Sequence, residues 1–145
     1  MDIKVLVVDD SALIRSLLSE IIRQEPGMQL VGAAKDAFVA KDMVMKFNPD
    51  VITLDIEMPK VDGLVFLDRL MKSRPTPVLM ISTLTQHGTD ATIKSLELGA
   101  IDFISKPKID VANGLRSYQQ EIVDKIRMAA SSKPRSYTSR RKTDN

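Results

Sequence analysis

Apolar side chains along the chain alternate between short continuous runs and longer, spaced stripes. The runs are rich in β-branched residues, which is typical of strands buried on both faces, and they span residues 3–8, 30–34, 51–54, 78–82 and 102–104. The stripes between them repeat at the spacing of an amphipathic helix, most clearly at Ile14, Leu17, Leu18, Ile21 and Ile22. The pattern therefore predicts five β-α units in strict alternation.

Capping and breaking residues mark where the predicted helices begin and end. Asp36 is a predicted N-cap for the second helix, and Asn113 is one for the last helix. Pro26-Gly27 ends the first helix, and Gly99 ends a fourth helix over residues 90–98. Each helix is thus joined to the next strand by a short connection.

Strict alternation of short strands and helices is the pattern of a parallel sheet covered by helices on both faces. Right-handed crossovers leave few topologies for such a sheet. We predict an α/β, flavodoxin-like (βα)5 fold, a doubly wound five-stranded parallel sheet with strand order 2-1-3-4-5. Ligands of such sheets bind beyond the carboxyl ends of the strands, so the residues there are the candidates for chemistry.

Composition narrows the possible chemistry. The chain has 145 residues, of which 43% are hydrophobic and 28% charged, which is typical of one globular domain. It has no cysteine, which rules out disulfides, a thiolate nucleophile and a cysteine-based zinc site. No apolar run approaches the roughly 18 residues needed to cross a bilayer, and the first residues do not resemble a signal peptide. We therefore expect a cytoplasmic protein without membrane insertion.

Charge is divided unevenly between the body of the chain and its end. The net charge is +2, but residues 131–145 carry five Lys or Arg and one Asp, a net +4. The first 130 residues carry a net charge of −2. The end segment has no aliphatic residue and cannot bury a face, so we predict a domain over residues 1–128 and a basic flexible linker over residues 129–145. Basic segments also occur in nucleic-acid-binding arms, but we expect no nucleic-acid partner.

Carboxylates follow the first and third predicted strands. Asp9 and Asp10 come directly after the first strand, and the third ends in Asp55, with Glu57 two residues later. Because the carboxyl ends of parallel strands meet at one edge of the sheet, these carboxylates should lie close together and repel one another unless a cation is bound. Oxygen ligands without histidine or cysteine select Mg²⁺, or Mn²⁺.

A hydroxyl and an ammonium group are predicted at the same edge. The fourth strand ends with Ser82, and Lys106 follows the fifth. Taken singly, Ser82 could be a helix cap and Lys106 an ordinary surface lysine. Together with the carboxylates, they place chemically active groups at the ends of four strands on one edge of the sheet. A divalent cation, a lysine, a hydroxyl and a spare carboxylate together suit a phosphoryl group held on an aspartate, which is a known covalent nucleophile.

Four motifs together resemble the receiver domain of bacterial two-component response regulators. They are VLVVDDS at 5–11, DVITLDIEMPxxDG at 50–63, PVLMIS at 77–82 and GAIDFISKP at 99–107. The resemblance covers about residues 3 to 128. Within that family, the segments DDSALIR, MISTLT and LELGAIDFISKP are similar to the receiver of chemotaxis protein-glutamate methylesterases.

The resemblance implies a metal site and a phosphoacceptor. Asp55 is the implied phosphoacceptor and also a ligand of the Mg²⁺ (or Mn²⁺) cofactor. Asp9, Asp10 and the backbone carbonyl of Glu57 are the other implied metal ligands. The fragment is then expected to catalyse only its own phosphorylation and dephosphorylation.

The resemblance also implies a conformational switch. Lys106 and Ser82 would contact the phosphoryl group, and Phe103 would turn inward when Ser82 moves towards it. Two residues depart from common receiver patterns. Glu57 adds a carboxylate beside the phosphoryl group, and Thr83 is larger than the residue usual after the switch hydroxyl. Both are expected to tune the lifetime of the phosphoryl group.

The implied partners follow from the same resemblance. A chemotaxis histidine kinase would phosphorylate Asp55 in a phosphorelay. A C-terminal methylesterase domain, a carboxylic ester hydrolase beyond the linker, would be inhibited by the unphosphorylated receiver. Phosphorylation would release that domain to demethylate chemoreceptors. The alternatives are a stand-alone receiver and the receiver of a DNA-binding response regulator.

Two other classes of protein are less consistent with the residues. A flavodoxin-type electron carrier needs a loop that cradles phosphate after the first strand, whereas this chain has Asp9-Asp10-Ser11 there. A phosphohydrolase with an aspartate nucleophile would suit the chemistry of Asp55 and Glu57. Such enzymes usually place the nucleophile after the first strand and carry a cap domain, and the sequence predicts neither.

Overall fold

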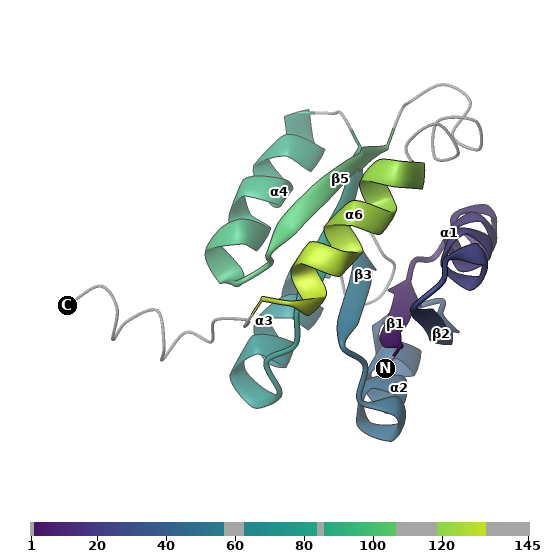
Figure 1. Cartoon of the computed structure of the whole chain (residues 1–145). Helices are drawn as coiled ribbons and strands as arrows, with labels where there is room; N and C mark the ends of the chain where they lie inside the picture. The colour runs from purple at the N-terminus through teal and green to yellow at the C-terminus, as the bar shows by residue number, and fades with distance from the viewer. Residues whose placement is uncertain (1, 57–62, 84–85, 107–118, 133–145) are drawn as a thin grey trace.

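The computed structural model describes residues 2–56, 63–83, 86–106 and 119–132, in which strands and helices alternate (Figure 1). The strands are β1 (Ile3–Val8), β2 (Met28–Ala34), β3 (Val51–Asp55), β4 (Val78–Thr83) and β5 (Asp102–Lys106). The helices are α1 (Ala12–Gln24), α2 (Ala37–Phe47), α3 (Gly63–Ser73), α4 (Gln86–Leu98) and α6 (Gln119–Ala130).

The five strands form one parallel sheet in the order β2-β1-β3-β4-β5. This confirms the predicted fold and strand order. The register aligns the carboxyl ends: Val8 of β1 lies opposite Leu54 of β3, and Asp55 lies opposite Ile81 of β4. The residues that follow β1 and β3 therefore emerge side by side at one edge of the sheet.

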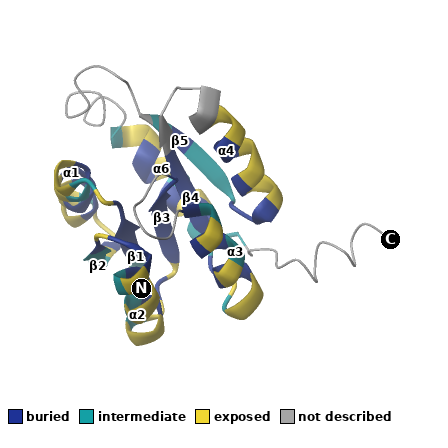
Figure 2. Cartoon of the chain, turned by 180° about the vertical axis from the view of Figure 1, so that it is seen from behind, coloured by how far each residue is buried: buried dark blue, intermediate teal, exposed yellow. Residues whose placement is uncertain are grey.

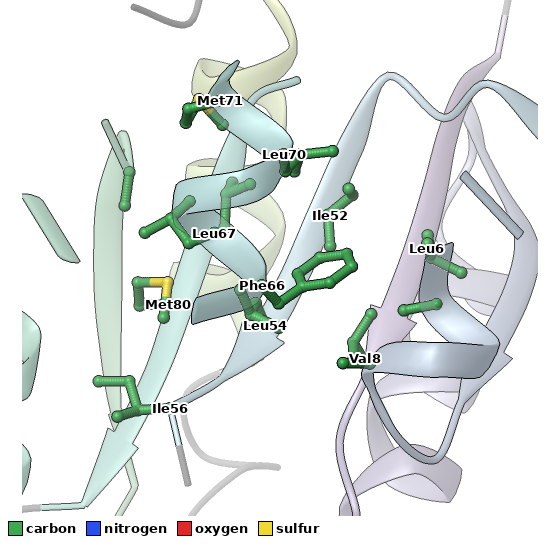
Figure 3. Packing of buried hydrophobic residues seen from close by; sticks show 14 of the residues in the cluster. Leu6, Val8, Ile52, Leu54, Ile56, Phe66, Leu67, Leu70, Met71 and Met80 are labelled. Atoms are coloured by element: carbon green, nitrogen blue, oxygen red, sulfur yellow. The ribbon is translucent and has the colours of Figure 1, made fainter. Parts of the chain in front are cut away.

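Helices cover both faces of the sheet. Helices α1 and α6 lie on one face (Figure 1), and α2, α3 and α4 lie on the other, which Figure 2 shows from behind. Alternate residues of β1 point to opposite faces, as expected for a strand: Val5 and Val7 join the core under α1 and α6, whereas Leu6 and Val8 join the other core. Figure 3 shows that second core, in which Phe66 and Leu67 of α3 pack over the sheet.

Several predicted element boundaries agree with the structure, but β2 begins at Met28 rather than at residue 30, and α4 begins at Gln86 rather than at residue 90. Asp36 caps α2, and its carboxylate accepts the backbone N–H of Val39 at 2.9 Å. Helix α4 ends at Leu98, and Gly99 follows with a φ of 120°, in the region that favours glycine. Strand β5 is longer than predicted because it continues through the polar residues Ser105 and Lys106, which the apolar run does not include.

The last helix ends beyond the predicted domain boundary at residue 128. Helix α6 continues to Ala130, and the side chain of Ala129 is buried in the core under α1 and α6. Alanine carries little periodicity signal next to a polar segment, which explains the difference. The predicted cap Asn113 and residues 133–145 of the predicted linker lie outside the described residues. None of the described helices is long and apolar enough to cross a membrane.

Thr53, at the centre of β3, offers a test of the buried sheet. It is fully buried between Val7 and Leu79 on the neighbouring strands, and its Oγ1 has no hydrogen-bond partner among the described residues. A buried hydroxyl without a partner is destabilising. We predict that Thr53→Val raises the free energy of unfolding by about 1 kcal/mol, as measured by urea denaturation.

Thr76→Val is the matched control for that measurement. Thr76 is also buried, but its Oγ1 donates a hydrogen bond to the carbonyl of Arg74 at 3.0 Å. The same substitution should therefore destabilise the protein at this position. A loss of stability in Thr53→Val equal to that in Thr76→Val would contradict the prediction.

Candidate functional site

Three carboxylates meet at the carboxyl edge of the sheet. Oxygen atoms of Asp9, Asp10 and Asp55 all lie within 4.8 Å of one another. Asp9 is fully buried and Asp55 is 5% exposed, whereas Asp10 is exposed. The cluster therefore has a buried base and one side open to solvent, through which a small ligand can reach it.

The sheet places these carboxylates. Asp9 directly follows β1, and Asp55 is the last residue of the adjacent strand β3. The residues just before them, Val8 and Leu54, are buried and lie opposite each other in the sheet. The backbone N–H of Asp9 also donates to the carbonyl of Ala34 on β2 at 3.0 Å. Main-chain hydrogen bonds on both sides of β1 thus determine where the acidic residues emerge.

The start of α1 holds Asp9 in place. The Asp9 carboxylate accepts the backbone N–H of Ser11 at 2.9 Å, and Arg15 Nη1 donates to the Asp9 carbonyl at 2.7 Å. Ser11 is the N-cap of α1, because its Oγ accepts the N–H of Ile14 at 3.3 Å. Ser11 rather than an aspartate therefore begins this helix, and the Asp10 side chain is left to the acidic cluster.

The electrostatics of the cluster favour a bound cation. At an effective dielectric constant of about 20, two unit charges this close repel by roughly 3 kcal/mol. The donor set consists of carboxylate oxygens alone, which matches the preference of Mg²⁺ or Mn²⁺ for oxygen ligands. Asp9, Asp10 and Asp55 therefore fit a hard divalent cation.

The structure places the backbones of two more predicted site residues at the same edge. Ser82 and Lys106 lie in the last residues of β4 and β5, where Ser82 pairs with Ser105 and Thr83 with Lys106. Ser82 follows Ile81, the residue opposite Asp55. The side chains of Ser82, Thr83 and Lys106, and the whole of Glu57, lie outside the described part of the chain, so their roles remain predictions.

Phe103 lies on the edge strand β5 and is contacted by a residue that the sequence did not indicate. Its half-buried ring packs against the core under α2, α3 and α4. Lys125 of α6 donates to the Phe103 carbonyl at 2.7 Å, and its Nζ lies 5.4 Å from the centre of the Phe103 ring. Lys125 also pairs with Asp102 and Glu121, each at 3.6 Å. This lysine joins α6 to the edge of the sheet.

Gly63, at the start of α3, packs directly against the end of β3. Its backbone N–H donates to the carbonyl of Ile56 at 2.9 Å. A Cβ at this position would lie 2.3 Å from the carbonyl oxygen of Asp55, which is closer than atoms can approach. Glycine is needed at this position because two segments of backbone meet here.

Comparison with known proteins identifies the class. Residues 5–115 match the model of the response regulator receiver domain. The chain therefore belongs to the response regulator receiver domain family, which confirms the resemblance drawn from its motifs. This membership favours a receiver over the flavin carrier and the phosphohydrolase considered above.

Within that family, the similar proteins include chemotaxis methylesterases. The chain is 65% identical over 133 residues to protein-glutamate methylesterase/protein-glutamine glutaminase 2 of Shewanella oneidensis, covering 92% of this chain and 38% of that protein. It is 61% identical over 130 residues to the protein of the same name in Pseudomonas aeruginosa, covering 90% and 37%. The crystal structure of the response regulator domain of Thermotoga maritima CheB is 45% identical, with a TM-score of 0.85, covering 92% of this chain and all of that one.

These comparisons define how much of a relative the chain represents. It spans less than two fifths of the length of the curated relatives it matches, but the whole of the solved CheB response regulator domain. The chain is thus a receiver domain of the kind found in CheB-type methylesterases, and its acidic cluster lies where the family motifs predict the phosphorylation site.

The contact between Gly63 and β3 can be tested by adding one methyl group. We predict that Gly63→Ala lowers the free energy of unfolding by about 1–3 kcal/mol, because backbone must shift to admit the new Cβ. It should also weaken Mg²⁺ binding, measured by isothermal titration calorimetry, because the shifted backbone belongs to Asp55 and Ile56.

Gly32→Ala is the matched control for this substitution. Its new Cβ would meet the Sδ of Met43 at 2.8 Å, near the end of a flexible side chain, and a methyl group of Leu6 at 3.3 Å. We expect a smaller loss of stability and unchanged Mg²⁺ binding. Equal effects of the two substitutions would show that the backbone contact at Gly63 has no special importance.

The contacts of Lys125 can be tested separately. We predict that Lys125→Met, which keeps most of the stem, lowers the free energy of unfolding by about 1 kcal/mol, since a charged hydrogen bond and two ion pairs are lost. The loss should shrink at high salt, which screens charges. Lys72→Met removes an exposed pair with Asp68 and should change little. A salt-independent loss at Lys125 would contradict the electrostatic explanation.

Proposed function

We propose that this receiver accepts a phosphoryl group on Asp55 and thereby controls a protein-glutamate methylesterase domain. The observation that carries the proposal is the acidic cluster of Asp9, Asp10 and Asp55 at the carboxyl edge of a receiver fold. A buried carboxylate with two acidic neighbours suits an aspartate that binds a divalent cation and a phosphoryl group together.

The reaction forms one bond and breaks another. A carboxylate oxygen of Asp55 attacks the phosphorus of a phosphohistidine on the kinase, or of a small phosphodonor. The new O–P bond forms as the N–P bond to the histidine breaks, and the bonding electron pair leaves with the imidazole nitrogen. Water then hydrolyses the acyl phosphate, which breaks the new O–P bond, releases inorganic phosphate and restores the Asp55 carboxylate.

The residues around Asp55 would hold a cation and a lysine that neutralise the negative charge of the transferred phosphoryl group. Asp9, Asp10, Asp55 and the backbone carbonyl of Glu57 are the proposed ligands of Mg²⁺ or Mn²⁺. The bound cation would supply positive charge to the oxygens of the transferred group. Lys106 would supply a second positive charge. Arg15 and Ser11 act indirectly, because they fix the backbone and carboxylate of Asp9.

Phosphorylation would change the surface formed by α4, β5 and α6. Ser82 would hydrogen-bond the phosphoryl group, and Phe103 would turn inward into the space that Ser82 and its loop leave. Lys125 favours the present orientation of the Phe103 ring, because its Nζ lies 5.4 Å from the ring centre. The input is a local change in charge, and the output is a shift in the population of two surface conformations.

The names of the relatives support a proposal for the domain that binds this surface. The relatives carry the name protein-glutamate methylesterase, and this chain matches less than two fifths of their length. The proposed reader is a C-terminal methylesterase domain joined through the linker over residues 129–145, which acts on chemoreceptors in the cytoplasm. A chemotaxis histidine kinase is the proposed phosphodonor. The names of these relatives favour this output over a stand-alone receiver or a DNA-binding regulator.

Phosphorylation of Asp55 is tested by intact-protein mass spectrometry. We predict that incubation with acetyl phosphate and Mg²⁺ adds the mass of one phosphoryl group to the wild-type protein. The gain should require Mg²⁺ and be absent in Asp55→Asn, which keeps the size of the side chain but removes the nucleophilic carboxylate.

Asp42→Asn provides the matched control. Asp42 is an exposed aspartate on α2, outside the acidic cluster. This variant should gain the phosphoryl group as the wild-type protein does. An equal gain in Asp55→Asn, or no gain in the wild-type protein, would remove the basis of the proposal while leaving the fold unchanged.

A further inference from the structure

A groove between α2 and α3 lies outside the acidic site. It has a volume of about 470 Å³ and runs along both helices, on the face of the sheet that Figure 2 shows. Buried apolar side chains from the two helices form its floor: Ala37, Val44, Phe66 and Leu70. None of the three clustered aspartates lines this groove.

Two large apolar side chains stand exposed at the groove. Phe38 is 58% exposed and Met45 is 64% exposed. They are seven residues apart on α2, so they lie about two turns apart on the same side of the helix. Exposed apolar side chains beside a groove with an apolar floor form a contiguous apolar surface, which is a feature of sites that bind another molecule.

Basic residues surround these apolar side chains. The side chains of Lys41, Arg69, Lys72 and Arg74 line the groove, and no acidic residue does. Lys72 pairs with Asp68 at 3.2 Å, but Asp68 is not among the lining residues. The groove is therefore positive, although the first 130 residues carry a net charge of −2. This local reversal of charge selects an acidic occupant.

We propose that this groove binds an amphipathic helix of a partner protein, with an apolar strip flanked by Asp and Glu. The apolar strip would contact Phe38 and Met45, and the acidic side chains would pair with Lys41 and Arg69. Helices α2 and α3 have 11 residues each, so the groove accommodates a partner helix of about three turns.

The charge of the groove disfavours two other occupants. Residues 131–145 of this chain carry a net +4 and would be repelled by the basic lining. A second copy placed groove to groove would bring two basic surfaces together. Neither occupant offers acidic groups to Lys41 and Arg69, so we assign the groove to an acidic helix of a partner protein. Lys72 already pairs with Asp68, and Arg74 Nη1 donates to the Val44 carbonyl at 3.2 Å, so these two residues add positive charge without needing a new partner.

An unbiased peptide selection tests the chemistry of the occupant. A phage-displayed library of helical peptides about 12 residues long is selected on the wild-type chain, with counter-selection on the Phe38→Ser/Met45→Ser double variant. We expect enrichment of peptides with apolar residues at i, i+3, i+4 and i+7 and with acidic flanks. Their affinities are then measured by fluorescence anisotropy.

Matched variants distinguish binding in the groove from nonspecific binding to exposed side chains elsewhere on the surface. Phe38→Ser/Met45→Ser and Lys41→Glu/Arg69→Glu should each weaken binding of a selected peptide by about tenfold or more. The controls are Ile93→Ser, which removes an apolar side chain of similar exposure on α4, and Lys94→Glu, which reverses an exposed charge there. Both controls should leave the affinity unchanged. Circular dichroism establishes that each variant is folded.

Several outcomes would overturn the proposal. One is that the selected peptides are not enriched in acidic residues. Another is that a selected peptide binds the groove variants as tightly as it binds the wild-type chain. Binding of vesicles of phosphatidylcholine and phosphatidylserine in a roughly 2:1 ratio, lost in the Phe38→Ser/Met45→Ser variant, would assign the groove to a membrane instead. A dimer in analytical ultracentrifugation that the same variant dissociates would assign it to a second copy. No phosphodonor is present in these experiments, so their result is independent of the proposed phosphorylation of Asp55.

Discussion

The site depends on bringing three like charges together at the end of a sheet. Asp9, Asp10 and Asp55 repel one another, and the free energy that holds them in place comes from the strands behind them. Val8 and Leu54 are buried next to the acidic residues and paired across β1 and β3. Both faces of these strands are buried, so a slip of one residue in either strand would exchange the side chains fitted to the core under α1 and α6 with those fitted to the core under α2, α3 and α4. The register that the core requires is thus the register that gathers the carboxylates.

The first turn of α1 and the start of α3 complete that support from either side. Ser11 both caps α1 and donates its N–H to the Asp9 carboxylate, so the helix cannot shift without disturbing the acidic cluster. Gly63 bonds the carbonyl of Ile56 and leaves no room for a side chain against Asp55. Two helices are therefore anchored directly to the strand ends that carry the carboxylates. A change in charge at Asp55 acts on backbone that is already in contact with both.

The sequence predicted the parts of this structure that follow from local pattern. Buried parallel strands are continuous apolar runs, so β1 and β3 were located closely, and Asp36 was identified as a cap because caps have a local signature. The acidic residues were predicted to meet because the topology brings strand ends together. Gly63 and Lys125 were not predicted to matter, because their importance arises from contacts with distant parts of the chain. The groove between α2 and α3 was missed for the same reason, since it takes two helices to form.

Helix α3 connects the acidic site with the groove. Its first residue, Gly63, touches the end of β3, and its exposed side carries Arg69 and Lys72 along the groove. Its inner side packs against the sheet (Figure 3) and also contacts α4. Bulk salt screens charges over about 10 Å, so the direct field of a phosphoryl group would be weakened at an exposed basic groove. Any coupling between the two surfaces would therefore have to pass through the contact of α3 with the end of β3, at Gly63, rather than through charge alone.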